Sequence, residues 1–148
     1  MIPCLTVRQP WAGRMFALPA AKDIENRTWS TRHRGRVAIH AGRQLDALGE
    51  EILGETPAVD LRDLGMIIGT VELVDCHEAE STECEDLRWG CYGNPWAFWP
   101  TDSRQRLVHW RIDHPREFVT PIAARGQVGL WTPPPSVAHL IEIAEVLA

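Results

Sequence analysis

Short apolar runs separated by turn residues dominate the chain, and most of them have the length of β-strands. The most apolar run extends from Gly65 to Cys76 and predicts a central strand. Shorter runs predict further strands over residues 5–7, 24–29, 36–40, 96–99, 108–112 and 127–131. Because these strands do not alternate regularly with helices, the pattern favours an α+β fold over a doubly wound parallel sheet.

Three segments predict helices at the periphery of a small β-barrel. Pro10 can precede the first turn of a helix over residues 11–18, because that turn needs no N–H from proline. A second helix is expected over 44–53, where leucine and isoleucine recur at helical spacing. After Pro133 to Pro135, Ser136 is expected to cap a last amphipathic helix, which carries Val137, Leu140, Ile141 and Val146.

The length and composition suit one domain over residues 1–148. The chain has 148 residues, of which 45% are hydrophobic, enough for a single core. It contains no apolar stretch near the roughly 20 residues of a membrane helix, and its first residues lack the order of a signal peptide. We therefore expect a cytoplasmic protein with no membrane partner.

The four cysteines are too few and too unevenly placed for a disulfide framework, so we expect reduced thiols. Cys76 and His77 precede Cys84 and Cys91 in an acidic segment. These gaps are wider than the tight cysteine pairs usual in structural zinc sites. The sequence alone therefore predicts no metal and no other cofactor.

Charge is distributed unevenly along the chain, although the net charge is only -5. Residues 8–43 carry +6, whereas residues 44–88 carry -11. This asymmetry predicts a positive surface on an acidic body, which is typical of proteins that contact phosphate locally. Alternatively, arginines of the first third pair with acids of the middle third, and folding removes the asymmetry.

The densest group of polar side chains lies between Lys22 and Trp29. Lys22 is the single lysine among 15 basic residues, and a desolvated lysine can lose its proton and act as a base or nucleophile. On a strand, alternate side chains share a face. Bringing Lys22 and Glu25 together would therefore require a bend or a bulge.

The spacing Lys22-x-x-Glu25-x-Arg27 resembles the signature of the ASCH family, usually written G-x-K-x-x-E-x-R. Further pieces agree in order along nearly the whole chain, namely Arg8-Gln9-Pro10-Trp11, Trp29, Arg34-Gly35, Ile39-His40-Ala41, Gly69-Thr-Val-Glu-Leu, Pro121-Ile122 and Gly129-Leu130-Trp131. The resemblance implies a PUA-like small β-barrel with a cleft beside the signature. It also implies a role in RNA binding, translation-linked coactivation or RNA processing.

Two positions depart from the family pattern. The signature glycine falls at Ala20, which would disfavour a positive φ there. Amidohydrolases of the same superfamily act on N4-acetylcytidine with a threonine near the signature lysine, and this chain has Glu25 at that place. Thr28 is nearby but out of register, so that chemistry does not carry over.

The first functional hypothesis is a binding module for RNA, other single-stranded nucleic acid or a modified nucleoside. Glu25 and Asn26 would recognise base edges, while Lys22 and Arg27 would neutralise phosphate or pair with Glu25. His40 is either a core residue or a cleft group. The expected cleft is formed by Trp11, Lys22, Glu25, Asn26, Arg27 and Trp29, with Arg32, Arg34 and Arg36 on phosphate.

The second hypothesis is a ribonuclease, or an amidohydrolase acting on a modified nucleoside. Lys22 would then be the base and Glu25 a proton shuttle. A third, supported only by charge, is a domain that docks protein through the acidic residues 44–88. The sequence leaves the ligand and the oligomeric state open.

Overall fold

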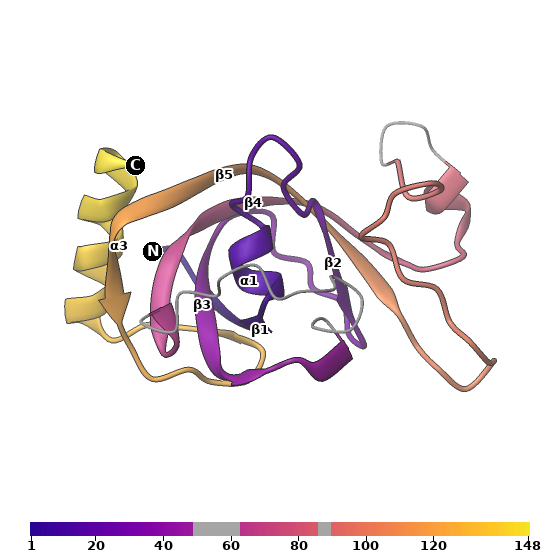
Figure 1. Cartoon of the computed structure of the whole chain (residues 1–148), viewed down its shortest axis with the longest axis horizontal. Helices are drawn as coiled ribbons and strands as arrows, with labels where there is room; N and C mark the ends of the chain where they lie inside the picture. Colours follow the sequence, from indigo (N-terminus) through magenta and orange to yellow (C-terminus); the bar gives the residue numbers. More distant parts are fainter. Residues whose placement is uncertain (49–62, 86–89) are drawn as a thin grey trace. The chain divides into compact units, whose positions relative to one another are not determined.

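The computed structural model describes residues 1–48, 63–85 and 90–148. Strands predominate among these residues, as expected (Figure 1). Their order is β1 (Cys4–Gln9), α1 (Trp11–Arg14), β2 (Ile24–Arg27), β3 (Gly35–Leu45), β4 (Met66–Glu78), the 3-10 helix η2 (Thr82–Glu85), β5 (Val108–Ala123), β6 (Leu130–Trp131) and α3 (Pro135–Leu147).

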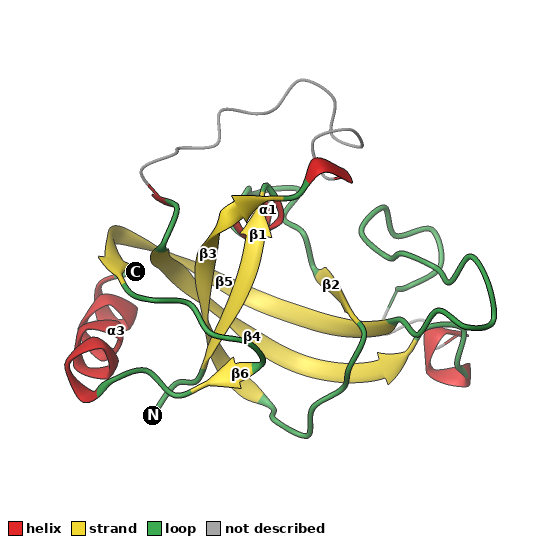
Figure 2. Cartoon of the chain, turned by 90° about the horizontal axis from the view of Figure 1, so that it is seen from below, coloured by secondary structure: helices red, strands yellow, loops and turns green. Residues whose placement is uncertain are grey.

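The described strands form one mixed sheet in the order β2-β5-β4-β3-β1-β6 (Figure 2). β1 runs parallel to β3 and antiparallel to β6, and β2 runs antiparallel to β5. The α+β class is therefore confirmed, but the closed barrel is wrong, because the strand order has two edges. The edge strands are short, with four residues in β2 and two in β6, which leaves little backbone for closing pairs.

Several predicted elements have different limits in the structure. The central strand is confirmed as β4, whereas the strand expected over 96–99 is wrong, since those residues form turn and irregular structure. The helix expected over 11–18 ends at Arg14. For the helix expected over 44–53, Gln44 and Leu45 belong to β3, residues 47–48 are helical, and 49–53 lie outside the described residues.

The described chain divides into two compact units. The first comprises residues 1–21, 36–71 and 115–148, and the second comprises 22–35 and 72–114. Because β4 and β5 cross from one unit to the other, each strand contributes one part to each core. That the two units act as one domain stays a prediction.

One apolar cluster of the first unit includes Ile141 of α3 together with residues of the sheet. In both views α3 lies beside the end of β5 (Figures 1 and 2). Ile141 of α3 is buried, whereas Leu140 and Val146 are exposed, so the helix buries one narrow stripe. Its N-cap is Pro134 rather than Ser136, which lies inside the first turn. The buried cluster comprises Cys4, Ala38, Ile67, Phe118, Ile122, Trp131 and Ile141.

Gly69 of β4 is required by a close approach within this unit. A Cβ at this position would lie 2.4 Å from the Arg116 carbonyl oxygen and 2.6 Å from the Phe16 ring. The first contact cannot be relieved without moving the backbone, and the second requires the ring to shift as well. The glycine at the start of the Gly69-Thr-Val-Glu-Leu run is therefore fixed by packing.

We expect Trp131→Ala to reduce the free energy of unfolding by roughly 3 to 5 kcal/mol, because the ring is buried and its removal leaves a cavity. Trp131→Phe should cost less, since it keeps a ring and loses the 3.2 Å hydrogen bond from Nε1 to Thr6 Oγ1. Urea unfolding of both variants measures the difference. Equal stability of Trp131→Ala and native protein would contradict the core assignment.

Candidate functional site

The signature residues lie in the second unit, where Glu25 is held between two cations. Lys22 precedes β2, and its Nζ donates to the Ile24 carbonyl oxygen at 2.5 Å and to the Glu25 carboxylate. The other Glu25 oxygen lies 3.0 Å from Arg27 Nε. The sequence left open whether Lys22 and Glu25 pair; in the structure they do, because the lysine lies before the strand and does not follow its alternation of faces.

Lys22 and Glu25 are both buried, with exposed fractions of 3% and 6%. Burial lowers the pKa of Lys22, while the charge of Glu25 and its hydrogen bond act in the opposite direction. A buried ammonium that donates to a carbonyl and a carboxylate of its own segment is suited to fixing that segment. This arrangement favours a positioning role for the pair over proton transfer to a ligand.

The pairing of β2 with β5 places the Glu25 carboxylate and a buried histidine on different faces of the strand pair. Glu25 lies opposite Trp110 and Asn26 lies opposite His109. Side chains of directly paired residues share a face, and neighbours along a strand alternate faces. The Glu25 carboxylate and the His109 imidazole therefore belong to opposite faces of this two-stranded ribbon.

Asn26 uses both ends of its amide inside the unit. Its Nδ2 donates to the Trp96 carbonyl oxygen at 2.8 Å, and its Oδ1 accepts from the Phe98 N–H at 2.9 Å. This side chain supplies hydrogen-bond partners to the main chain of residues 96–98, which belong to no strand. The amide is thereby already engaged where base recognition was expected.

The aromatic candidates differ in burial. Trp29 is half-buried and packs edge-on against Trp110, with ring centroids 4.6 Å apart. Trp110 is buried and its Nε1 donates to the Trp29 carbonyl oxygen at 3.0 Å. Trp11 belongs to α1 in the first unit and is buried. Trp29 thus keeps part of its ring accessible, whereas Trp11 is a core residue of its own unit.

His40 is also a buried residue of the first unit. Its Nε2 lies 2.9 Å from the Ala124 carbonyl oxygen, and its ring meets Trp131 edge-on at 5.9 Å. Burial lowers the pKa of His40, so the neutral imidazole is favoured. Of the two roles left open by the sequence, the geometry favours the core histidine.

The three arginines expected on phosphate have different surroundings. Arg32 and Arg34 are exposed on the segment between β2 and β3. Arg36, at the start of β3, is bound within the first unit, where its guanidinium contacts Glu145 at 2.6 Å and Thr70 at 2.5 Å. Arg36 is thus engaged by an acid of α3, while Arg32 and Arg34 face solvent.

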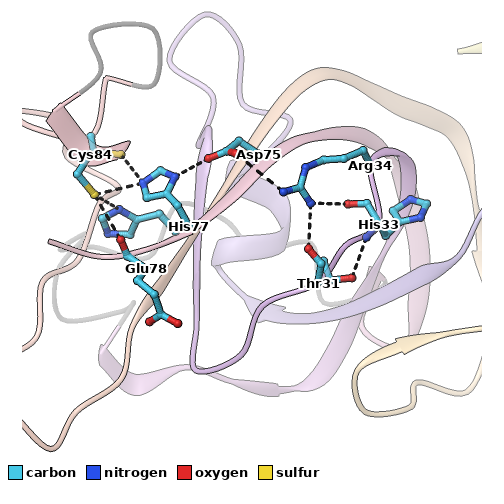
Figure 3. A network of polar contacts seen from close by, with 9 residues as sticks. Thr31, His33, Arg34, Asp75, His77, Glu78 and Cys84 are labelled. Atoms are coloured by element: carbon cyan, nitrogen blue, oxygen red, sulfur yellow. Dashed lines mark hydrogen bonds and ion pairs between the residues drawn. The ribbon is translucent and has the colours of Figure 1, made fainter. Parts of the chain in front are cut away.

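Arg34 is oriented by contacts within its own unit (Figure 3). Its Nη1 donates to the carbonyl oxygens of Thr31 at 2.9 Å and of His33 at 2.8 Å. Its Nη2 lies 3.9 Å from Asp75 Oδ1. The loop and its guanidinium therefore hold each other in place.

Two further features of the second unit were not predicted from the sequence, where His77, Cys84 and Cys91 were considered as metal ligands but rejected on their spacing and His109 was not included. A surface groove of about 580 Å³ is lined by residues 78–80 and 100–107, none of which belongs to the signature. Separately, four buried side chains of His and Cys converge, although their spacing lacks a close cysteine pair. They are His77, Cys84, Cys91 and His109.

Comparison with known proteins identifies the family. The model of the ASCH domain matches residues 5–121. The chain belongs to the ASCH domain family. This family is generally associated with RNA binding. At the position of the signature glycine this chain has Ala20, which does not adopt a positive φ.

Relatives of this ASCH domain are distant. "Activating signal cointegrator 1" from Homo sapiens is 32% identical over 83 residues, which cover 49% of this chain and 14% of the human protein. The chain thus spans only a small part of that relative's length. The crystal structure of ASCH from Zymomonas mobilis matches with a TM-score of 0.57 at 14% identity, covering 97% of this chain and 95% of the other.

The crystal structure of a mutant form of the Zymomonas mobilis protein gives a TM-score of 0.59 at 13% identity, with 97% of this chain and 98% of the other covered. At such identities the likeness concerns the fold alone. Within the described part of the chain, no helix has the length and apolar character needed to cross a membrane.

We expect Lys22→Met and Glu25→Gln each to cost roughly 3 to 5 kcal/mol of unfolding free energy, because each strands a buried partner. The double variant should lose less than the sum of the two. Denaturant unfolding of all four proteins measures the coupling. As a control, Glu78→Gln breaks the exposed pair with Arg106 and should cost about 1 kcal/mol or less. Strict additivity at Lys22 and Glu25 would contradict the buried pair.

Acid should destabilise the first unit through His40. The folded-state pKa of His40 lies below the ordinary 6.5. The contribution of the neutral His40 to the free energy of unfolding is therefore complete above pH 6.5, and it is lost as the pH falls through the lowered pKa. His40→Gln should therefore flatten the loss of stability between neutral and acid pH. His139→Gln, which changes an exposed histidine of α3, should leave the profile unchanged. Identical profiles for the native protein and His40→Gln would refute this contribution.

Proposed function

We propose that this ASCH domain binds single-stranded RNA, or a modified nucleobase within it, through residues 28–34. The observation that carries the proposal is the combination of Trp29, Arg32 and Arg34 on one loop of one unit. Trp29 is half-buried, whereas both arginines are exposed. An accessible indole can stack on a base while nearby guanidinium groups contact phosphate.

The order within this loop supports binding without large rearrangement. Trp29 is fixed against Trp110, and Arg34 is oriented by two carbonyl oxygens. A side chain that is already held loses less conformational entropy when it binds a ligand. Arg32 adds a second exposed cation two positions away.

The signature triad has a different role in this proposal from the one first expected. Lys22, Glu25 and Arg27 are joined to one another, and Asn26 is bound to residues 96–98. These residues fix β2 and thereby the start of the loop. They set the position of Trp29 and the arginines instead of reading a base themselves.

The test is a salt series of binding to short single-stranded RNA. Each phosphate contact should contribute about 0.7 to the slope of log affinity against log salt. Arg32→Ala with Arg34→Ala should therefore lower the slope by about 1.4 if each arginine meets one phosphate. An unchanged slope would exclude this loop as the binding surface.

Two further variants complete the design. Trp29→Ala should weaken binding by about 1 to 3 kcal/mol through lost stacking, and its unfolding curve separates this loss from lost packing on Trp110. Arg104→Ala removes an exposed arginine that lines the groove of the same unit and should leave affinity unchanged. If Arg104→Ala alone weakened binding, the groove would be the site instead of the loop.

A further inference from the structure

Four side chains of the second unit converge at one buried point that the proposed RNA contact does not use. His77 lies in β4, Cys84 in η2, Cys91 in the following loop and His109 in β5. Each is buried, and one ligand atom from each lies within 4.8 Å of all the others. All four cysteines of the chain are free thiols in the structure, including Cys84 and Cys91.

The distances between the ligand atoms of this cluster agree with tetrahedral metal geometry. His77 Nε2 lies 3.2 Å from Cys84 Sγ and 3.3 Å from Cys91 Sγ, and His109 Nδ1 lies 3.5 Å from Cys84 Sγ. Zinc bonds of about 2.3 Å to sulfur and about 2.0 Å to nitrogen place such atoms about 3.5 Å apart around a tetrahedral ion. Only small side-chain movements are needed for all four to share one ion.

The outer nitrogen of each imidazole is bound to an acceptor, which directs the inner lone pair into the cluster. His109 Nε2 lies 2.8 Å from the Phe98 carbonyl oxygen, which can only accept, so Nε2 carries the proton and Nδ1 is free of it. His77 Nδ1 lies 2.5 Å from Asp75 Oδ2, and Figure 3 shows this ring between Asp75 and Cys84. A carboxylate or carbonyl behind each histidine is the usual outer support of a metal-bound imidazole.

We propose that His77, Cys84, Cys91 and His109 bind one Zn²⁺ ion as a structural site. A set of two thiolates and two imidazoles in tetrahedral arrangement is typical of zinc. On binding, the two thiols release their protons to solvent, the ion accepts lone pairs from two sulfurs and two nitrogens, and no redox change occurs. With all four positions filled by protein, the site has no open place for a substrate.

The surroundings explain why a metal would be useful here. Among the described residues, one apolar cluster of this unit is small, comprising Ile24, Cys84, Cys91 and Ala97 with two partly buried tryptophans. An ion joining η2 and its loop to β4 and β5 would link irregular segments to the sheet. Small cores commonly depend on such cross-links.

The first experiment measures metal in the full chain, expressed without a histidine tag and purified without chelator. Elemental analysis should find about one zinc per chain, as expected for a closed four-ligand site. Cys84→Ser and Cys91→Ser should lose it. Cys76→Ser is the matched control, because Cys76 adjoins His77 in sequence but is not part of the cluster, and it should retain the zinc. Native protein without zinc that cannot be reloaded would overturn the proposal.

A second measurement does not depend on whether the serine variants fold. Zinc-free native protein, prepared with chelator and reductant, is titrated with Co²⁺. Tetrahedral binding by two thiolates should give intense visible bands and a sulfur-to-cobalt charge-transfer band that Zn²⁺ then abolishes. An octahedral cobalt spectrum, or iron in place of zinc in the protein as purified, would refute the zinc site.

A third variant tests the carboxylate of Asp75, which lies behind His77. Asp75→Asn keeps the four ligands but replaces the carboxylate behind His77, and it should weaken zinc affinity by about 10- to 100-fold in competition with a chelating dye. Unchanged affinity would contradict the role of Asp75 in orienting His77. RNA binding is recorded separately for each protein, so that failure of the RNA proposal and failure of the zinc proposal give different results.

Discussion

A carboxylate that is buried away from water needs cations or hydrogen-bond donors in place of its hydration. In this chain the cations that pair with Glu25 fix the arrangement around β2. One oxygen meets Lys22 and the other meets Arg27. Lys22 can reach the carboxylate only because β2 begins after it, at Ile24. Buried ion pairs of this kind add little net stability but penalise any register that separates them. The triad therefore defines where the loop of residues 28–34 begins.

The short strand β2 is common to the proposed RNA-binding loop and the proposed zinc site, and the residues of the two sites lie on opposite faces of its pair with β5. The Glu25 side of the β2–β5 pair carries Trp110, against which Trp29 packs, and the other side carries His109. Asp75 touches both regions, since it contacts His77 and lies 3.9 Å from Arg34 (Figure 3). A metal bound by His77 would thus help to hold Asp75, which in turn faces an arginine of the loop proposed to contact RNA.

Folding reduces the positive surface that the charge distribution predicts. Arg34 approaches Asp75 of the acidic middle third, as the alternative interpretation anticipated. Arg36 instead pairs with Glu145 of α3, far along the chain. Arg27 is engaged by Glu25. The cations that remain exposed on the loop, Arg32 and Arg34, are fewer than the sequence suggests, which concentrates the proposed phosphate contact.

The sequence by itself determined the family, the α+β class and the central strand β4, because each depends on local patterns of apolar and polar residues. Whether Lys22 and Glu25 pair was left open by the sequence and was decided by the structure. The limits of α1 and the edges of the sheet depend on packing and could not be read locally. The hydrogen bonds of Asn26 could not be predicted from the sequence either, since their partner is the main chain 70 residues away. The cluster of His77, Cys84, Cys91 and His109 was decided only by the tertiary structure. Its two histidines lie on strands distant in sequence, and a metal-binding geometry depends on distances in space, which wide sequence spacing does not reveal.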